Sequence, residues 1–276
     1  MLKDAQLLRL RLNVAGADAE IEAPAPVIDV VARMLGPIPR TWRGEPLRIA
    51  VRARFASDVW KIAGSATKSK KTFANTKAIP HVAGAVVSSL VAELAYHRKL
   101  SAWRGAALER GNNGIALVGE DWETIVVIAA HLHTRGWRIL GTDHVLVDPQ
   151  TFVAEAFRKL MHANSFCGPS FPRRYRTAIE ASPWYAGANT IEYYAVDPGL
   201  VEGTPAWGDS APIRAVVRID GHSAEYPALE VADDFRIADR LRRSDVVSSG
   251  IECGVLVRAG FIETCDFLER WFASLA

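Results

Sequence analysis

The sequence is poor in cysteine, and its cysteines are not arranged for disulfides or for a metal. Among 276 residues there are three, Cys167, Cys253 and Cys265, and no Cys-x-x-Cys pair occurs. An odd number of cysteines without paired spacing argues against a disulfide framework. We therefore expect three buried, reduced thiols and a cytoplasmic location.

Long apolar runs and a strong charge of one sign are also missing. No stretch of about 18 consecutive apolar residues occurs, and the N-terminal segment MLKDAQLLRLRLNV has no apolar centre or small-residue cleavage site typical of a signal peptide. The 33 Lys and Arg residues nearly balance the 31 Asp and Glu residues. We therefore expect neither a membrane nor a nucleic acid as partner, and the 49% of hydrophobic residues is typical of a soluble globular protein.

The first part of the chain has the period-two alternation of β-strands. Apolar and polar residues alternate over residues 8–14 and 47–55, and a further strand is expected near 60–62. Apolar residues on one face predict a short helix over 27–35. Residues 1–78 are therefore predicted to form a small N-terminal β-rich region with an antiparallel sheet.

From residue 79 the pattern changes to alternating strands and helices. An apolar helix is expected over 79–97, followed by strand, strand, helix, strand and strand over 105–148. Further strands are expected over 191–196 and 213–219, a helix over 231–243, and an amphipathic C-terminal helix over 261–275. Residues 79–276 are therefore predicted to form one α/β domain with a mixed sheet around a buried helix over 125–132.

Residues 114–128 read GIALVGEDWETIVVI, in which a short strand, a glycine, a tight loop and an apolar helix follow one another. This is the frame of a phosphate-binding loop, G-x-x-x-x-G-K-[ST], in which backbone N–H groups hold phosphates, the lysine reaches them and the hydroxyl holds Mg²⁺. Here the loop contains no lysine and its centre is acidic.

The segment from Arg104 to Pro149 resembles the HPr kinase/phosphorylase family. RGAALERGNNGIALVG is similar to the family's strand, turn and strand before the phosphate loop, and LHTRGWRILGTDHVLVDP is similar to its helix end, arginine-glycine turn and acidic second motif. The resemblance implies a P-loop, HPr-kinase-like α/β core.

The resemblance also implies what the loop has lost. Gly119 takes the first glycine position, Thr124 the second glycine, Ile125 the lysine, and Val126 the serine or threonine. Trp122 replaces a glycine that lets the backbone approach the ligand. Three acidic residues, Glu120, Asp121 and Glu123, would face the charge of a nucleotide. The degenerate loop predicts no nucleotide, no metal and no other cofactor.

The remaining family positions leave two hypotheses open. Arg104 stands where the resemblance implies a catalytic histidine, Glu109 is similar to an acidic residue that follows it, and Thr142-Asp143 replaces a pair of aspartates. In the first hypothesis the protein is a pseudokinase that binds a peptide or protein partner, as in the synthesis of a modified peptide. In the second it is a phosphotransferase that acts on a peptide or protein serine through an altered site of Arg104, Glu109, Asp143 and His144.

The acidic loop itself allows three predictions. The first is that the loop forms a plain solvated turn. The second is that it presents Trp122 as the anchor of an interface. The third is that Trp122 folds back and fills the abandoned phosphate pocket. In the last case Ile125 is buried too, because an interior void is costly.

His131 and His133, two apart on a helix, point in different directions and are not expected to share a metal. Homo-oligomerisation is left open.

Overall fold

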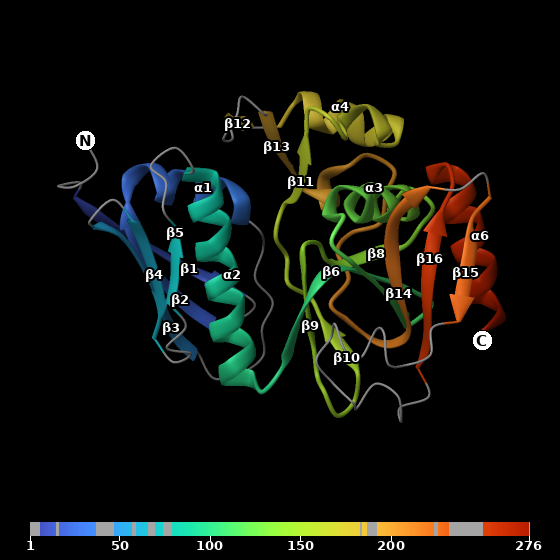
Figure 1. Ribbon diagram of the computed structural model, residues 1–276, viewed down its shortest axis with the longest axis horizontal. Helices are drawn as coiled ribbons and strands as arrows, with labels where there is room; N and C mark the ends of the chain where they lie inside the picture. The colour runs from blue at the N-terminus through green and yellow to red at the C-terminus, as the bar shows by residue number, and fades with distance from the viewer. Residues whose placement is uncertain are drawn as a thin grey trace.

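A computed structural model of the chain shows a mixed α/β architecture (Figure 1). It describes residues 6–14, 17–36, 47–56, 59–65, 70–73, 79–182, 184–186, 192–223, 226–231 and 251–275. Within these residues the strands form a five-stranded, an eight-stranded and a three-stranded sheet. The predicted helix over 231–243 lies, apart from Val231 in a strand, outside the described residues.

The five-stranded sheet contains the predicted N-terminal strands. Its order is β1 (Leu7–Val14), β2 (Ala17–Pro24), β3 (Leu47–Ala56), β4 (Val59–Gly64) and β5 (Lys70–Phe73). The prediction of an antiparallel sheet is wrong at one pairing, because β2 and β3 run parallel. Helix α1 (Ala25–Leu35) lies between them in the chain and makes the crossover that a parallel pair requires.

Helix α2 (Ile79–Arg98) packs against this N-terminal sheet. Val86, Leu90 and Leu94 are fully buried, and they share one apolar core with Val51 and Trp60 of the sheet. The helix is long and apolar enough to cross a membrane, but 61% of its most apolar window is buried inside the protein. Core packing accounts for its composition. The domain boundary expected at residue 78 remains a prediction. The helix α2, which follows that boundary in the chain, shares its apolar core with the N-terminal sheet.

The eight-stranded sheet forms the centre of the second half of the molecule. Its strands follow the order β10, β9, β6, β7, β14, β16 and β15, and β8 pairs with β6. β14 runs parallel to both β7 and β16, whereas β6 is antiparallel to β7, so the predicted mixed sheet is confirmed. The strands are β6 (Ser101–Arg110), β7 (Asn113–Val118), β8 (Arg138–Gly141), β9 (His144–Val147), β10 (Val153–Glu155), β14 (Ser210–Ser223), β15 (Ala228–Val231) and β16 (Glu252–Arg258).

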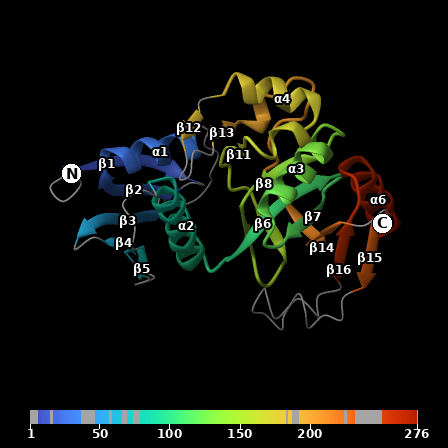
Figure 2. The same ribbon diagram turned by 45° about the horizontal axis from the view of Figure 1, so that its top comes forward.

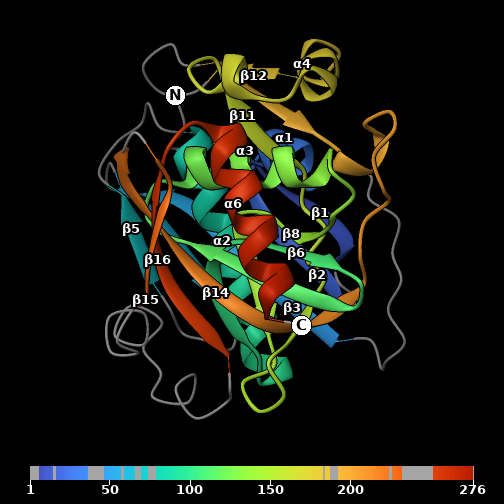
Figure 3. The same cartoon turned by 90° about the vertical axis from the view of Figure 1, so that its right-hand side faces the viewer.

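Helix α3 (Trp122–His133) is the buried helix that the sequence predicts. Nine of its twelve residues are buried, so its apolar sequence faces protein on nearly all sides. It packs against the sheet and against the C-terminal helix α6 (Phe261–Ser274), which lies in the foreground of Figure 3. Arg135, just after α3, holds Asp266 and Glu269 of α6 at 2.6 and 3.0 Å.

A smaller layer lies at the top of the views in Figures 1 and 2. Its three-stranded sheet has the order β11 (Met161–Asn164), β13 (Glu192–Val196) and β12 (Trp184–Ala186), accompanied by helix α4 (Arg173–Glu180). Short 3-10 turns lie at Gly168–Ser170 and Pro198–Leu200. All three cysteines are free and buried, as the sequence predicts.

Candidate functional site

The loop between β7 and α3 begins at Gly119, whose backbone no other residue fits easily. Its φ is +155°, and a Cβ at this position would lie 2.9 Å from the backbone oxygen of Ile219 on β14. Glycine therefore fits both the conformation and the close approach of two backbones. Strand packing alone accounts for this glycine.

The N-terminus of α3 is capped by its own loop. Asp121 is the N-cap residue, and its side-chain Oδ1 accepts a hydrogen bond of 3.1 Å from the backbone N–H of Thr124. The N–H of Trp122 donates to the backbone oxygen of Glu120 at 3.0 Å. Free N–H groups at a helix N-terminus are what bind phosphate in a phosphate loop. Here a carboxylate of the chain takes that place, and its negative charge suits the positive end of the helix dipole.

The two residues at the lysine and hydroxyl positions of the resemblance point into the core. Ile125 is 1% exposed and Val126 is 2% exposed. The predicted burial of Ile125 is confirmed. Trp122 is half-buried and packs against the same core, as expected if it folds back over the space beside α3. The acidic residues of the loop differ in their surroundings. Glu120 is exposed, whereas Glu123 accepts a hydrogen bond from the side-chain amide of Asn164 on β11.

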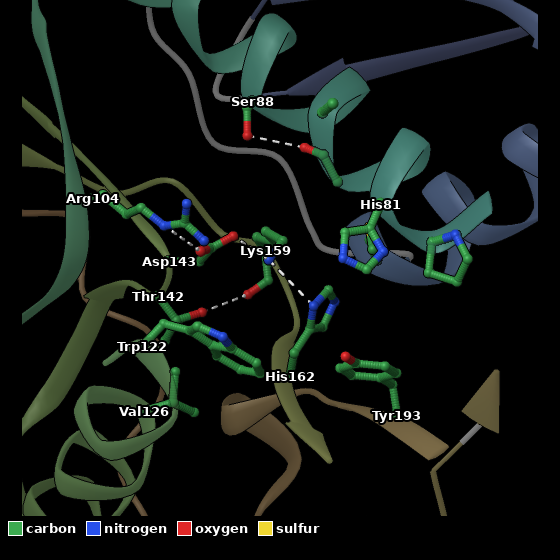
Figure 4. A pocket seen from close by; sticks show the side chains of 14 residues that line it. His81, Ser88, Arg104, Trp122, Val126, Thr142, Asp143, Lys159, His162 and Tyr193 are labelled. Carbon is green, nitrogen blue, oxygen red and sulfur yellow. Dashed lines mark hydrogen bonds and ion pairs between the residues drawn. The ribbon is translucent and has the colours of Figure 1, made fainter. Parts of the chain in front are cut away.

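A cavity of about 330 Å³ lies beside this loop, between α2 and the rest of the molecule (Figure 4). One wall comes from α2 and the end of α1, the other from α3, the bend between β8 and β9, and strands β6, β11 and β13. Trp122 and Val126 belong to its lining, so the cavity adjoins the loop between β7 and α3.

Asp143 stands at the centre of the polar lining. It lies in the bend that joins β8 to β9, two successive strands that both pair antiparallel with β6, and its φ is +69°. Its Oδ2 lies 2.9 Å from Nζ of Lys159 and 3.4 Å from Nδ1 of His144, and its Oδ1 lies 3.8 Å from Nε of Arg104. Burial by itself would raise the pKa of the Asp143 carboxyl, but the charges of Lys159 and His144 hold it well below the usual range. Asp143 is therefore an ionised carboxylate that is already paired.

Glu109 lies apart from this cluster. It is 3% exposed, and its Oε1 lies 2.6 Å from Nε of Arg138 on β8. It is five residues from Arg104 on β6, so the two lie about 16 Å apart along the strand and on opposite faces. The structure thus brings Arg104, Asp143 and His144 together and leaves Glu109 in a separate ion pair.

Three functional groups of the cavity escaped the sequence analysis. Lys159 is 2% exposed, and besides Asp143 its Nζ lies 3.5 Å from Nδ1 of His162. Burial first, and the charge of Lys159 second, hold the pKa of His162 well below its usual value, so this imidazole is neutral at neutral pH. Tyr193 of β13 completes the group. The one local signal was a lysine in the segment FRKLMH, where apolar residues lie on both sides.

The two helix histidines have separate partners, as predicted. Nε2 of His131 lies 3.0 Å from the backbone oxygen of Ser170. His133 is buried, with Nδ1 2.7 Å from the hydroxyl of Tyr175 and Nε2 2.9 Å from the backbone oxygen of Pro205. Across the described part of the chain, no group of three His, Cys, Asp or Glu side chains is placed to hold a metal ion.

Comparisons with known proteins find only a distant similarity for this chain. No protein-family model matches it, and no curated protein matches it. Among solved structures it is similar to the HPr(Ser) kinase/phosphatase from Coxiella burnetii, with a TM-score of 0.32 and 11% sequence identity, over 63% of this chain and 93% of that chain. At this TM-score the similarity is a distant one that does not establish a shared active site. The mixed α/β architecture stands on the structure itself.

Proposed function

We propose that this protein is a non-catalytic, HPr-kinase-like protein, a pseudokinase that binds a peptide or protein partner. The observation that carries the proposal is the N-terminus of α3. The carboxylate of Asp121 accepts the hydrogen bond from the N–H of Thr124. A phosphate at this position would meet a negative charge in place of free N–H donors.

The replaced residues support the same proposal. Ile125 and Val126 are buried, so neither offers a charge or a hydroxyl to a nucleotide or to Mg²⁺. Asp143 is the carboxylate that remains of the pair implied by the resemblance, and Lys159 already neutralises it. Phosphoryl transfer needs the lysine, the metal ligands and a positioned base together.

The cavity supports a binding role. The space beside Trp122 and Val126 remains open to about 330 Å³ although the residues of phosphate chemistry are replaced. A partly open space lined by both apolar and charged groups is typical of ligand sites. The partner, the cytoplasmic location and homo-oligomerisation remain predictions.

One observation favours a second candidate function. Arg104, Asp143 and His144 lie together beside the cavity, and Lys159 and His162 join them. Charged and neutral titratable groups at one cavity are typical of catalytic sites. The alternative is therefore a phosphotransferase with an altered site, which acts on a peptide or protein serine.

The two functions are separated by turnover. We expect no Mg²⁺-dependent hydrolysis of ATP above the rate of the buffer, with or without a serine-containing acceptor peptide. The variant Asp143→Asn should give the same result, because no turnover is expected to depend on this carboxylate. Arg173→Gln is the control variant, since Arg173 is exposed on α4 away from the cavity lining. Turnover that Asp143→Asn abolishes and Arg173→Gln preserves would establish the altered-site enzyme instead.

A further inference from the structure

We propose that the cavity between α2 and α3 binds a carboxylate attached to a small apolar or aromatic body, with Arg104 facing the anion. This inference rests on the proposed function, because it names the ligand chemistry of the same site. The carboxylate can belong to a free organic acid or to the C-terminus of a peptide, and the two sources are separated by the experiment below.

The Arg, Lys and Asp side chains that line the cavity sum to one positive charge. Asp143 and Lys159 neutralise each other at 2.9 Å, and the imidazole of His162 is neutral. Arg104 adds a guanidinium, whose contact with the same carboxylate is the longer one at 3.8 Å. The side chain of Arg104 is 69% exposed, so most of its five N–H donors are not used in that contact. A guanidinium with donors to spare is the group that binds a carboxylate through two parallel hydrogen bonds.

A second cation can contribute to the same anion. Lys159 lines the cavity, and its ammonium group has three N–H donors. Two of these three donors face Asp143 and His162. The third N–H can donate to an occupant, and because Lys159 is 2% exposed, this donor is held away from bulk water. A buried donor favours a charged acceptor over a neutral one.

The rest of the lining selects the body that carries the carboxylate. Met34, Pro80 and Ala85 form an apolar part of the wall on the side of α1 and α2, and Trp122 and Val126 face them from α3. Figure 4 shows Trp122 and Val126 on one side of the cavity and His81 and Ser88 of α2 on the other. A volume of about 330 Å³ is at the lower end for small-molecule sites. The site therefore suits a body the size of one ring or one side chain.

Gly84 gives a way to close the cavity without changing a charge. It lies on α2 in the cavity lining, and a Cβ added there would meet no atom within 4 Å. A leucine at this position would extend into the open space, whereas an alanine would leave most of it free. Both residues are better helix formers than glycine, so neither variant is expected to unfold α2.

The experiment is a calorimetric titration of the full chain with benzoate and with hippurate, and with benzamide and hippuramide as their uncharged counterparts. A short peptide ending in phenylalanine is titrated as the free acid and as the amide. We expect the acids to bind at least tenfold more tightly than the amides. Arg104→Gln should weaken the acids by roughly tenfold, Gly84→Leu should abolish binding, and Arg173→Gln and Gly84→Ala should match the unaltered protein.

Each outcome decides something. Tighter binding of benzoate and hippurate assigns the cavity to free acids, and tighter binding of the peptide acid assigns it to peptide C-termini. Equal binding of acids and amides, unchanged binding by Gly84→Leu, or no binding of any acid at about 10 mM would overturn the inference. Mg²⁺-ATP is titrated separately. Its binding together with that of the acids would contradict the proposed function alone, and failure of both ligands to bind would overturn this inference alone.

Discussion

The side chain of Asp121 caps the helix that begins one residue later, accepting a hydrogen bond of 3.1 Å from the N–H of Thr124. The helix end that would hold phosphate in a phosphate loop therefore holds a carboxylate of the chain itself. This one contact gives the acidic loop a structural role that the sequence analysis did not assign to it.

Removing the cap should destabilise the protein without creating a nucleotide site. Asp121→Ala is expected to lower the free energy of unfolding by about 1 kcal/mol, because the N–H of Thr124 loses its partner. Asp121→Asn keeps an acceptor oxygen, so it should lower the free energy of unfolding by only about a few tenths of a kcal/mol. Urea unfolding of the three proteins measures the difference. Equal stability of Asp121→Ala and the unaltered protein would show that the cap contributes nothing.

Introducing the residues of a phosphate-binding loop should not create a phosphotransferase. Ile125→Lys places an ammonium group where the side chain is 1% exposed, so we expect a loss of about 3 kcal/mol or more in unfolding free energy. Ile125→Leu is the control and should cost less than about 1.5 kcal/mol. The combined variant Trp122→Gly, Thr124→Gly, Ile125→Lys and Val126→Ser should be less stable still and should hydrolyse no ATP. Kinase-like turnover with an unchanged melting temperature would refute the view that the replaced side chains contribute to the packed core.

The ion pair of buried Lys159 with partly buried Asp143 should contribute a coupling free energy to the stability of the protein, so that losing one partner costs more when the other is present. Lys159→Met leaves the Asp143 carboxylate without its closest cation and is expected to cost about 3 kcal/mol. The double variant Lys159→Met, Asp143→Asn removes both charges, so it should be more stable than Lys159→Met. Chemical unfolding of the single and double variants forms the cycle. Purely additive losses would contradict the coupling.

Stability should fall in mild acid because of His133. Burial lowers the pKa of this imidazole from 6.5 to about 4. The unfolded chain therefore takes up a proton at a higher pH than the folded chain, and stability that is present above about pH 6.5 is lost as the pH falls toward 4. Between pH 7 and pH 5 the loss from this group is about 2 kcal/mol. Unfolding measured at both pH values should show a smaller pH dependence for His133→Gln, and an identical dependence would contradict the assignment.

Local sequence patterns predicted most strands and helices, because each depends on residues close together in the chain. The alternation before residue 63 and the apolar helix after Asp121 both have their counterparts in the structure. The parallel pairing of β2 with β3 was missed, because it depends on where α1 returns the chain. The sequence also did not show which sheet α2 covers, because an apolar helix carries no mark of its packing partner.

The candidate site was less predictable, because it joins distant segments. Arg104, Asp143 and His144 could be found from the resemblance, whereas Lys159 and His162 come from a segment with no motif. The sequence analysis placed Glu109 in one site with Arg104, but its position on β6 directs it to Arg138. No local pattern contains the contact of Lys159 with Asp143, which forms only when the chain is folded.

The most direct test of the account is a calorimetric titration of the full chain with ATP and with GTP, each in the presence and absence of Mg²⁺. With Asp121 at the helix N-terminus and Ile125 and Val126 in the core, we predict no binding tighter than about 1 mM, which corresponds to about −4 kcal/mol. Saturable, Mg²⁺-dependent binding of either nucleotide in the micromolar range, lost in Asp143→Asn, would contradict the central proposal that the loop between β7 and α3 does not bind phosphate.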